Sequence, residues 1–396
     1  MSRALTVSIV LIVGLALIVA SCGRVMRLER ERISAEGYAI SRGTAAQLGA
    51  DDRAEFGGRL SLLWSEGLSG KPAGPLAIHN DLIIFPESKK KIRFFEVASG
   101  DQPGRWRANG VPQTGVAVAD SLAIYGVSPR KDFLRAVDFL TGKRLWQRNV
   151  KDVRPGPIIV GNRLIVSSAD GRVLALELGD GETAWETRPE WRPSAAASYG
   201  HGRIFQPCDR GRLYALSADS GRELYEVRVD GPLVSPVAVG DLIYAAVMTG
   251  QVYGVDPDDG RVVWQSEIGG PTWTSPAVCN GRLFVGHSGG ELVALDAADG
   301  QILWRHATGH VIRASALAVG DKVVFGTMTG QLFVLKAEDG AVVDSTTLSG
   351  AIEVPPVTDG RRLFVATQAG KIYCFGDVHE QAVAADQRID VGLQSQ

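Results

Sequence analysis

The chain has no excess of charge of either sign. Its 396 residues hold 42 Lys and Arg against 44 Asp and Glu, which gives a formal net charge of -2 with both signs mixed along the sequence. A nucleic-acid-binding protein usually carries a basic field, so this balance argues against that class. We therefore expect no nucleic-acid partner.

Motifs that would mark an active site are also missing. We find no Ser-His-Asp arrangement and no phosphate-binding loop in a suitable context. Among the six histidines, His306 and His310 straddle a turn, and no third ligand stands at zinc-binding spacing. Asp-Gly turns such as 256–260 lack the glutamate of a calcium-binding EF-hand. The sequence predicts no catalytic residue and no metal site.

Cysteine is scarce, at four residues in the whole chain. Cys22 follows the apolar N-terminus, and the other three, Cys208, Cys279 and Cys374, are an odd number at unrelated spacings. They fall in separate repeats of the pattern described next, too far apart to pair. We predict a domain without disulfides whose cysteines are buried or semi-buried thiols.

Helical periodicity is absent from the repeats, whereas glycine is abundant, at 47 residues. The phrase LVALDAADGQILW at 292–304 combines an apolar run, an Asp-Gly turn and a second run that ends in Trp. Nearly the same phrase recurs as RVLALELGDGETAW and QVYGVDPDDGRVVW. Short apolar runs between Gly and Asp turns indicate antiparallel strands joined by hairpins.

One position closes each copy of this phrase. Steps of 39 to 42 residues separate its occupants, which are Trp64, Trp106, Trp146, Trp185, Tyr225, Trp264, Trp304 and Asp344. A period near 40 residues with several strands in each unit is typical of a propeller. A large aromatic at this site can be buried between neighbouring blades, so we expect the weakest blade contact at the aspartate.

Each repeat contains a triplet of inner strands and one outer strand that ends at the aromatic position. The chain holds eight triplets and eight outer strands, but it begins with an outer strand and ends with a triplet. The first outer strand, near 59–64, precedes every triplet, and the last triplet has no outer strand after it. Pairing the N-terminal strand with the last sheet leaves no open edge at the seam. The sequence predicts an all-β, eight-bladed β-propeller over 59–377, closed in this way, with a polar tail at 378–396.

The N-terminus indicates export and a lipid anchor. An apolar run at 4–20 follows Arg3 and ends in Val19-Ala20-Ser21-Cys22, which resembles a bacterial lipobox. An uncleaved membrane anchor is the alternative, but the run is short and four arginines follow it, against the positive-inside tendency. We expect a signal peptide at 1–21, lipidation on Cys22 and a flexible tether without strands at 22–58.

The repeated phrases resemble the quinoprotein-type (pyrroloquinoline quinone-like) propeller repeat. DGRVLALELGDGETAW, GGELVALDAADGQILW and TGQLFVLKAEDGAVV carry the resemblance, which covers residues 59 to about 377. Eight such blades behind a lipobox are similar to the outer-membrane protein assembly lipoproteins of the BamB type. The resemblance implies a monomeric, non-catalytic periplasmic scaffold, lipid-anchored to the outer membrane, that binds the β-barrel assembly machinery.

The same resemblance implies a partner-binding loop near the middle of the chain. In the BamB type a loop before an inner strand carries an Arg and apolar residues that engage the barrel-inserting protein, and TRPEWRPSAAAS resembles that loop. Trp191 and Arg192 are the positions carried over. The next connecting loop offers Asp230 where the family tends to show an acidic cluster.

The mouth of the central channel is a second candidate surface. Trp273 lies just before an innermost strand, and Arg154, Arg313 and Glu353 fall at similar positions. Such a ring of side chains can bind an anionic or aromatic ligand or anchor a partner chain, although solvated loop residues are the alternative.

A quinone- or sugar-binding propeller, enzymatic or sensory, is therefore the competing function. The related quinone-dependent dehydrogenases typically stack their quinone on a Trp and an adjacent-Cys disulfide and hold Ca²⁺ beside it. This chain is much shorter and has no adjacent cysteines. We expect no cofactor and no enzyme activity.

Overall fold

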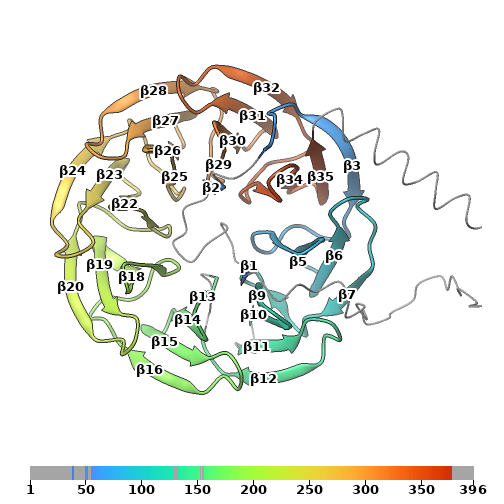
Figure 1. Ribbon diagram of the computed structural model, residues 1–396, viewed down its shortest axis with the longest axis vertical. Helices are drawn as coiled ribbons and strands as arrows, with labels where there is room; N and C mark the ends of the chain where they lie inside the picture. The colour runs from blue at the N-terminus through green and yellow to red at the C-terminus, as the bar shows by residue number, and fades with distance from the viewer. Residues whose placement is uncertain are drawn as a thin grey trace, which may run out of the picture.

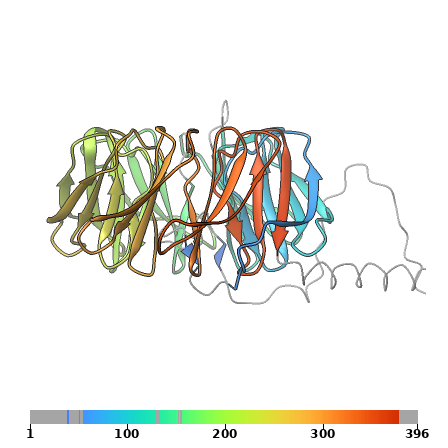
Figure 2. The ribbon, with the colours of Figure 1, turned by 90° about the horizontal axis from the view of Figure 1, so that it is seen from above.

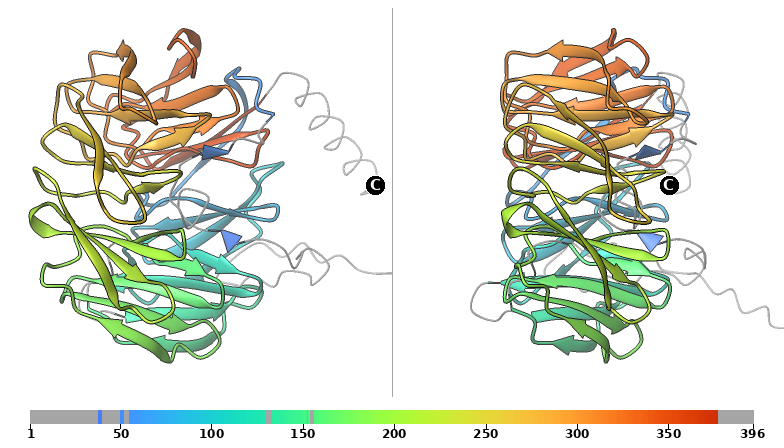
Figure 3. Two further views of the ribbon diagram at one scale, coloured as in Figure 1. Left: turned by 60° about the vertical axis from the view of Figure 1, so that its left-hand side comes forward. Right: turned by 90° about the vertical axis from the view of Figure 1, so that its left-hand side faces the viewer.

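Eight sheets surround a central axis in the computed structural model, which describes residues 38–39, 50–51, 55–128, 133–151, 153 and 156–376 (Figure 1). Seen from the side, the sheets form a flat ring (Figure 2), and oblique views show them standing next to one another like blades (Figure 3). The predicted all-β, eight-bladed propeller is confirmed. We number the blades 1 to 8 in the chain order of their innermost strands.

The first four blades run in strict chain order from the innermost to the outermost strand. Blade 1 contains β4 (Ala77–His79), β5 (Leu82–Glu87), β6 (Lys91–Glu96) and β7 (Gly104–Arg107). Blade 2 contains β9 (Ala117–Ala119), β10 (Leu122–Ser128), β11 (Phe133–Asp138) and β12 (Arg144–Arg148), with β8 (Val111–Pro112) beside β10. Blade 3 contains β13 (Ile158–Val160), β14 (Arg163–Ser168), β15 (Arg172–Glu177) and β16 (Thr183–Thr187). Blade 4 contains β17 (Ser198–Gly200), β18 (Arg203–Cys208), β19 (Arg212–Ser217) and β20 (Glu223–Arg228), with a 3₁₀ turn at Asp209–Gly211.

The last four blades repeat this order, except that the outermost strand of blade 8 comes from the N-terminal side. Blade 5 contains β21 (Ala238–Val239), β22 (Ile243–Ala246), β23 (Gln251–Val255) and β24 (Val262–Glu267). Blade 6 contains β25 (Ala277–Cys279), β26 (Arg282–Gly286), β27 (Glu291–Asp296) and β28 (Ile302–Ala307). Blade 7 contains β29 (Leu317–Val319), β30 (Lys322–Gly326), β31 (Gln331–Lys336) and β32 (Val342–Thr347). Blade 8 contains β33 (Val357–Thr358), β34 (Leu363–Thr367), β35 (Lys371–Gly376) and β3 (Ser61–Gly67).

The ring has two different faces. Each innermost strand starts at the face that carries the segments between blades, such as 231–237 and 270–276, which we call the connector face. It ends at the opposite face, which carries the turns to the second strand, such as 280–281 and 320–321, and which we call the turn face. Hairpins between second and third strands, including Asp209–Gly211, also lie at the connector face.

The middle strands are buried on both sides because they pack against two neighbouring blades. In β27 the four residues Leu292, Val293, Ala294 and Leu295 are all fully buried, so the strand is a continuous apolar run rather than an alternating one. The turn that follows is held by the Asp296 carboxylate, which accepts the backbone N–H of Ala298 at 2.8 Å. The core therefore lies between blades and extends around the ring.

The ring closes through β3, as the sequence predicts. This strand is antiparallel to β35, in a register from Ser61 opposite Gly376 to Gly67 opposite Lys371. Just before it, the backbone N–H of Glu55 donates to the carbonyl of Gly360 at 2.7 Å. The last sheet is therefore completed by main-chain hydrogen bonds to residues far away in the sequence.

The regularly spaced aromatics lock each blade to the next. Seven turn glycines at positive φ lie directly under the aromatic ring of the preceding blade, in the pairs Trp64–Gly100, Trp106–Gly142, Trp146–Gly181, Trp185–Gly221, Tyr225–Gly260, Trp264–Gly300 and Trp304–Gly340. In six of the pairs the aromatic side chain also donates a hydrogen bond to the carbonyl of the residue three positions before that glycine. The donor is the indole N–H of Trp or the hydroxyl of Tyr225, for example Trp264 to Ala297 at 3.1 Å. The predicted burial between blades is confirmed for Trp64, Trp106, Trp146, Trp185 and Trp264, whereas Tyr225 and Trp304 are half-buried against the core.

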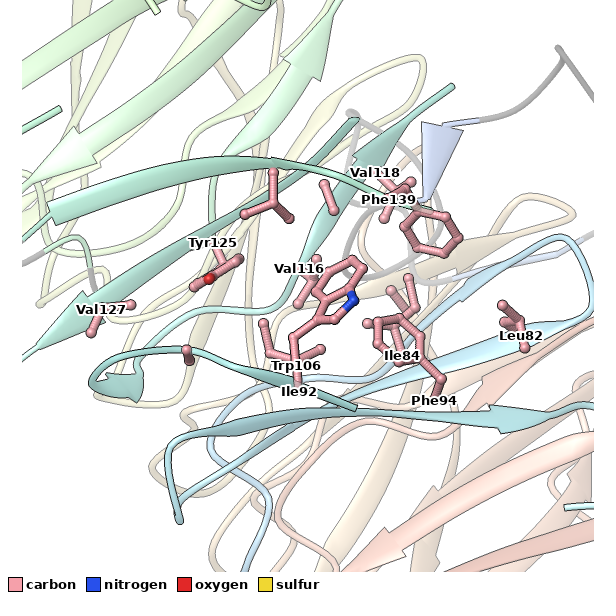
Figure 4. Close-up of a cluster of buried hydrophobic side chains, with 14 of the residues drawn as sticks. Leu82, Ile84, Ile92, Phe94, Trp106, Val116, Val118, Tyr125, Val127 and Phe139 are labelled. Carbon is pink, nitrogen blue, oxygen red and sulfur yellow. The ribbon is translucent and has the colours of Figure 1, made fainter. Parts of the chain in front are cut away.

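Trp106 is the exception in this set. Within the described part of the chain its indole N–H has no hydrogen-bond partner. Its ring instead meets Phe94 and Phe139 edge-on, with centroids 4.5 and 5.7 Å away (Figure 4). Aromatic packing of this kind compensates for the missing bond at the border of blades 1 and 2.

Asp344 stands where the lock cannot form. Blade 8 has no hairpin between its third and outermost strands, because β35 and β3 come from opposite ends of the domain. There is consequently no turn glycine for an aromatic at 344 to cover. The Asp344 carboxylate instead accepts the backbone N–H of Leu60 at 2.9 Å, and Phe56 is buried in the core between blades 7 and 8. The expected weak contact is thus supplemented by the N-terminal segment.

The segment 22–58, for which the sequence predicts no strand, differs from that expectation at two places. β1 (Tyr38–Ala39) pairs antiparallel with β9, and β2 (Ala50–Asp51) pairs parallel with β29. Both extend the inner edges of blades 2 and 7, near the turn face (Figure 2). Inner strands leave an edge of backbone groups open toward the axis, which explains why extended backbone attaches there.

Two other sequence expectations concern the cysteines and the membrane. Cys208, Cys279 and Cys374 lie as buried thiols in blades 4, 6 and 8, as predicted, and burial raises the pKa of the Cys208 thiol. Cys22 and the other residues of 1–37 lie outside the described residues. Among the residues that are described, none belongs to a helix long and apolar enough to span a bilayer.

A buried ion pair fastens the seam between blades 8 and 1. Glu87 is fully buried and lies 3.2 Å from the Arg93 guanidinium, while Ser69, in the connection from β3 to β4, donates to Glu87 at 2.9 Å. Burial alone raises the pKa of Glu87, but the Ser69 hydrogen bond and the Arg93 charge outweigh it and hold the pKa below its ordinary 4.5.

The aromatic-glycine lock can be tested by adding one methyl group. Gly300→Ala places a Cβ against the Trp264 indole at φ +74°, whereas Gly281→Ala meets nothing within 4 Å at φ +70°. We expect Gly281→Ala to cost about 1–2 kcal/mol from its backbone alone and Gly300→Ala to cost about 1–3 kcal/mol more. Thermal unfolding of both variants measures the difference, and equal losses would argue against the lock.

The buried ion pair predicts a pH-dependent loss. Glu87→Gln is expected to cost about 3–5 kcal/mol at pH 7, because it leaves Arg93 buried without its counter-charge. Since the folded pKa is lowered, this contribution is full above pH 4.5 and is lost as the pH falls below it. Melting curves from pH 7 downward should show the two proteins converging. Glu182→Gln, at an exposed pair with Arg148, is the control and should cost less than about 1 kcal/mol.

Candidate functional site

Three predicted channel residues share one structural position on the connector face. Trp273, Arg313 and Glu353 each stand four residues before the innermost strand of blades 6, 7 and 8. The corresponding residue of blade 3 is Arg154, which lies outside the described residues. The repeat therefore gives Trp273, Arg313 and Glu353 the same place on the connector face of three successive blades.

Trp273 is pushed outward by its neighbours. Thr272 and Thr274 are buried, and both hydroxyls donate to the carbonyl of Gly286, at 2.6 and 2.9 Å. Because alternate residues of an extended segment point to opposite sides, the indole between them faces solvent and is 37% exposed. A large aromatic held open in this way is available to a ligand or a partner.

Arg313 reaches across the blade border to Trp273. Its guanidinium carbon lies 4.9 Å from the centre of the Trp273 ring, which is a cation-π contact. Buried Ile312 and Ala314 flank Arg313 and fix its direction. Glu353 is exposed, and no ion pair joins it to Arg313 among the residues that the structure describes. Two of the four predicted channel residues are thus brought together.

Trp191 lies on the connector face of blade 4. Its ring is half-buried against the core between blades 3 and 4. The Arg210 guanidinium stacks over it, 4.6 Å from the ring centre, and that of Arg212 lies 5.8 Å away. The chain around it is tied down, since the Asp209 N–H donates to the carbonyl of Arg192 at 2.8 Å.

Arg192 and Asp230, which the sequence groups with Trp191, are both exposed on the same face. The backbone N–H of Asp230 donates to the Tyr253 hydroxyl at 3.1 Å, and its carbonyl accepts the Thr249 hydroxyl at 3.1 Å. No ion pair between Arg192 and Asp230 is present in the described part of the molecule. They therefore stand on successive connecting segments as separate charges.

The sequence prediction missed Arg210 and Arg212. Both come from the hairpin that follows Trp191 by about twenty residues, and Arg210 adopts a left-handed backbone, with φ 60° and ψ 33°. The signal in the sequence is the stretch Asp209-Arg210-Gly211-Arg212, in which an arginine precedes the turn glycine. Its contact with Trp191 depends on tertiary packing and leaves no periodic mark.

Neither metal nor turn chemistry adds a further site. Within the described ranges no group of three or more His, Cys, Asp or Glu side chains gathers as metal ligands would. His306 packs edge-on against Phe325 and Phe333, and burial lowers its pKa. The Asp256 carboxylate accepts the N–H of Asp258 within its own turn, which accounts for that motif.

A cavity of about 730 Å³ opens at the rim between blades 2 and 3. Its charged lining residues are three arginines and one glutamate, and most of their charges are already paired. Arg148 lies 2.6 Å from Glu182, and Arg172 lies 2.8 Å from Asp170 and 3.7 Å from Glu186. The cavity therefore offers little uncompensated charge to a ligand.

Comparison with known proteins identifies the family. The family profile described as outer membrane protein assembly factor BamB matches residues 34–188, 169–246 and 209–391, which together span the propeller. The chain belongs to this family. The expected quinoprotein-type, BamB-like repeat is thereby confirmed.

Individual BamB relatives are distant. The chain is 27% identical to outer membrane protein assembly factor BamB of Burkholderia pseudomallei over 165 residues, or 40% of this chain and 42% of that protein. It is 22% identical to the Legionella pneumophila factor over 183 residues, or 42% of this chain and 46% of that one. The matches thus span less than half the length of these relatives.

Solved structures share the fold. The crystal structure of BamB from Moraxella catarrhalis superposes with a TM-score of 0.69 at 20% identity, over 81% of this chain and all of that one. A quinohemoprotein alcohol dehydrogenase of Pseudomonas putida reaches 0.74 at 13% identity, over 90% and 83% of the two chains. Since BamB and enzymes superpose almost equally well, the fold does not decide the function.

Proposed function

We propose that this protein is a non-catalytic periplasmic scaffold that assists the assembly and insertion of outer-membrane β-barrel proteins by binding the insertase. The observation that carries the proposal is the surface around Trp191 and Arg192 on the connector face. Trp and Arg dominate the energetic centres of protein interfaces, and here they stand together on a rigid element. Membership of the BamB family supports the choice of partner.

Rigidity is what the ring contributes to this role. The aromatic-glycine locks and the closure by β3 hold the described sheets of the ring, and the connecting segments between them that the structure describes, in a fixed arrangement. A binding surface built from such segments loses little conformational freedom when the partner docks. The scaffold therefore works through geometry and needs no reaction.

The connector face suits a partner better than the rim does. Seven of the outermost strands carry a β-bulge at or next to the residue before the regular aromatic position. Bulges twist an edge strand and interrupt its hydrogen-bonding pattern, which discourages addition of another strand. We therefore place insertase binding at the loops of blades 4 and 5, including Asp230, rather than at the outer strands.

Attachment to the outer membrane through a lipid on Cys22 is part of the same proposal. The apolar run before Cys22 is removed with the signal peptide at 1–21, and residues 22–58 link the anchor to the ring. The pairing of β1 and β2 with the inner edges of blades 2 and 7 shortens the free part of that link. The tail at 378–396 has no role in the proposal.

Trp273 and Arg313 favour one competing function, a ligand site at the channel mouth. An exposed indole stacked on a guanidinium fits an aromatic or anionic ligand such as a quinone. Among the described residues, Glu353 is the one carboxylate at the repeat position that Trp273 and Arg313 occupy. No group of three or more described His, Cys, Asp or Glu side chains gathers there to hold a calcium ion. They fit a quinone-calcium pair poorly, and we derive no reaction from it.

Insertase binding is tested by crosslinking in cells. A photo-crosslinking residue at position 192 should form an adduct with the outer-membrane insertase, because this side chain is exposed on the connector face. The same residue at position 338 lies in the turn between β31 and β32 on the opposite face and serves as the control. Adducts with other proteins only, or equal insertase adducts from both positions, would count against the proposal.

The channel site is tested by fluorescence. We expect no saturable change in Trp273 emission when pyrroloquinoline quinone with Ca²⁺, or a panel of simple sugars, is titrated into the protein. Trp273→Phe is the matched variant, since the difference between the two titrations isolates this indole from the other seven tryptophans. A saturable quench that disappears in Trp273→Phe would favour the competing function.

A further inference from the structure

Trp191 occupies a position that is glycine in most blades. Trp191 stands seven residues before the innermost strand of its blade, and the residues at the same position in the other blades are Gly70, Gly110, Lys151, Gly231, Gly270, His310 and Gly350. A Cβ on Gly231 would lie 2.7 Å from the Thr249 hydroxyl, and one on Gly270 would lie 2.6 Å from the His287 ring. The hairpin of the following blade fills this space at Gly231 and Gly270, so an indole at these positions would need a hairpin of a different shape.

The hairpin of blade 4 has that different shape. Arg210 is left-handed, whereas the residues at the same hairpin position in blades 3 and 5, Asp170 and Thr249, are not among the residues with positive φ. An arginine is penalised in this conformation, which glycine adopts freely. In return its guanidinium lies over Trp191, with its central carbon 4.6 Å from the ring centre. Strained backbone of this kind is characteristic of functional positions.

The charges around Trp191 are unevenly compensated. Arg212 lies 2.8 Å from Glu226, which also contacts Arg228 at 3.2 Å. Arg192 and Arg210 have no carboxylate within ion-pair distance among the described residues. Arg210 thus holds over the indole a guanidinium that has no carboxylate partner among the described residues, and Arg192 adds a second one on the adjacent, exposed residue. Both charges are available to a carboxylate from another molecule.

We infer that Arg210 is a positioning residue that holds the Trp191 indole as a docking point for an acidic, apolar-flanked segment of the insertase. This inference rests on the proposed function and adds the chemistry of the partner's side. The apolar part of the segment packs on the exposed edge of Trp191, while its carboxylate pairs with Arg192 and Arg210. The strain at Arg210 is retained because it orients the indole before the partner arrives.

Arg210→Gly separates this role from a merely structural one. Glycine relieves the left-handed backbone, so the melting temperature should stay equal or rise, while loss of the stacked guanidinium should weaken binding about 3- to 30-fold. The probe is the purified periplasmic domain of the insertase, titrated against the full chain. Arg210→Lys keeps a charge over the ring and should recover part of the affinity. A second measurement follows the fluorescence of Trp191, which is isolated by comparison with Trp191→Phe. This emission should change when Arg210 is removed.

Lys90→Gly is the matched control. Lys90 is also left-handed, at φ 61°, in the equivalent hairpin of blade 1, where it stands one position later, at the place of Gly211. No cation-π contact involves Lys90 in the described residues. Its melting temperature should respond like that of Arg210→Gly, but binding should not change. If the wild-type chain fails to bind the insertase domain, the proposed function fails. If the wild-type chain binds but Arg210→Gly binds equally well, the inference about Arg210 is wrong while the proposed function stands. The same holds if Arg210→Gly lowers the melting temperature instead of weakening binding.

Discussion

The contact between one aromatic and one glycine of the next blade sets the architecture of the whole ring. It requires a large ring at the outer strand of one blade and a residue without Cβ, at positive φ, in the last turn of the next. The two partners are therefore about 36 residues apart, and this distance is repeated seven times. Because each lock joins neighbours only, no blade is stable alone, and the ring must close to use them all.

Closure explains the one position where the aromatic is replaced. The sequence predicted the eight blades and the strand that joins the last one, because both follow from a local pattern repeated along the chain. Its reading of Asp344 as a weak point was incomplete, since the reason for an aspartate there is topological. A blade whose outer strand comes from the other end of the domain has no turn glycine to cover, and the carboxylate binds the incoming Leu60 backbone instead.

The sequence indicates candidate-site residues only where they share a repeat position or lie in a loop that resembles one of the family. Trp191 was indicated by the resemblance of its loop to a family loop. Trp273 and Arg313 share a repeat position, and the structure brings them into contact. Arg210 could not be found in the same way. Its partner lies on another segment, and its left-handed backbone follows from a hairpin shape that the letters Asp-Arg-Gly-Arg permit but do not require.

Departures from a repeat have two kinds of cause, and the two are separable here. Asp344 breaks the repeat where the topology of the ring changes, so the fold itself demands it. Trp191 breaks it inside blade 4, whose strand order matches that of its neighbours, so the topology of the ring does not call for an indole. It also requires a strained arginine beside it, which a repeat under selection for stability alone would have replaced by glycine. A half-buried aromatic on a loop beside a residue with strained backbone is therefore the departure on which the proposed docking role rests.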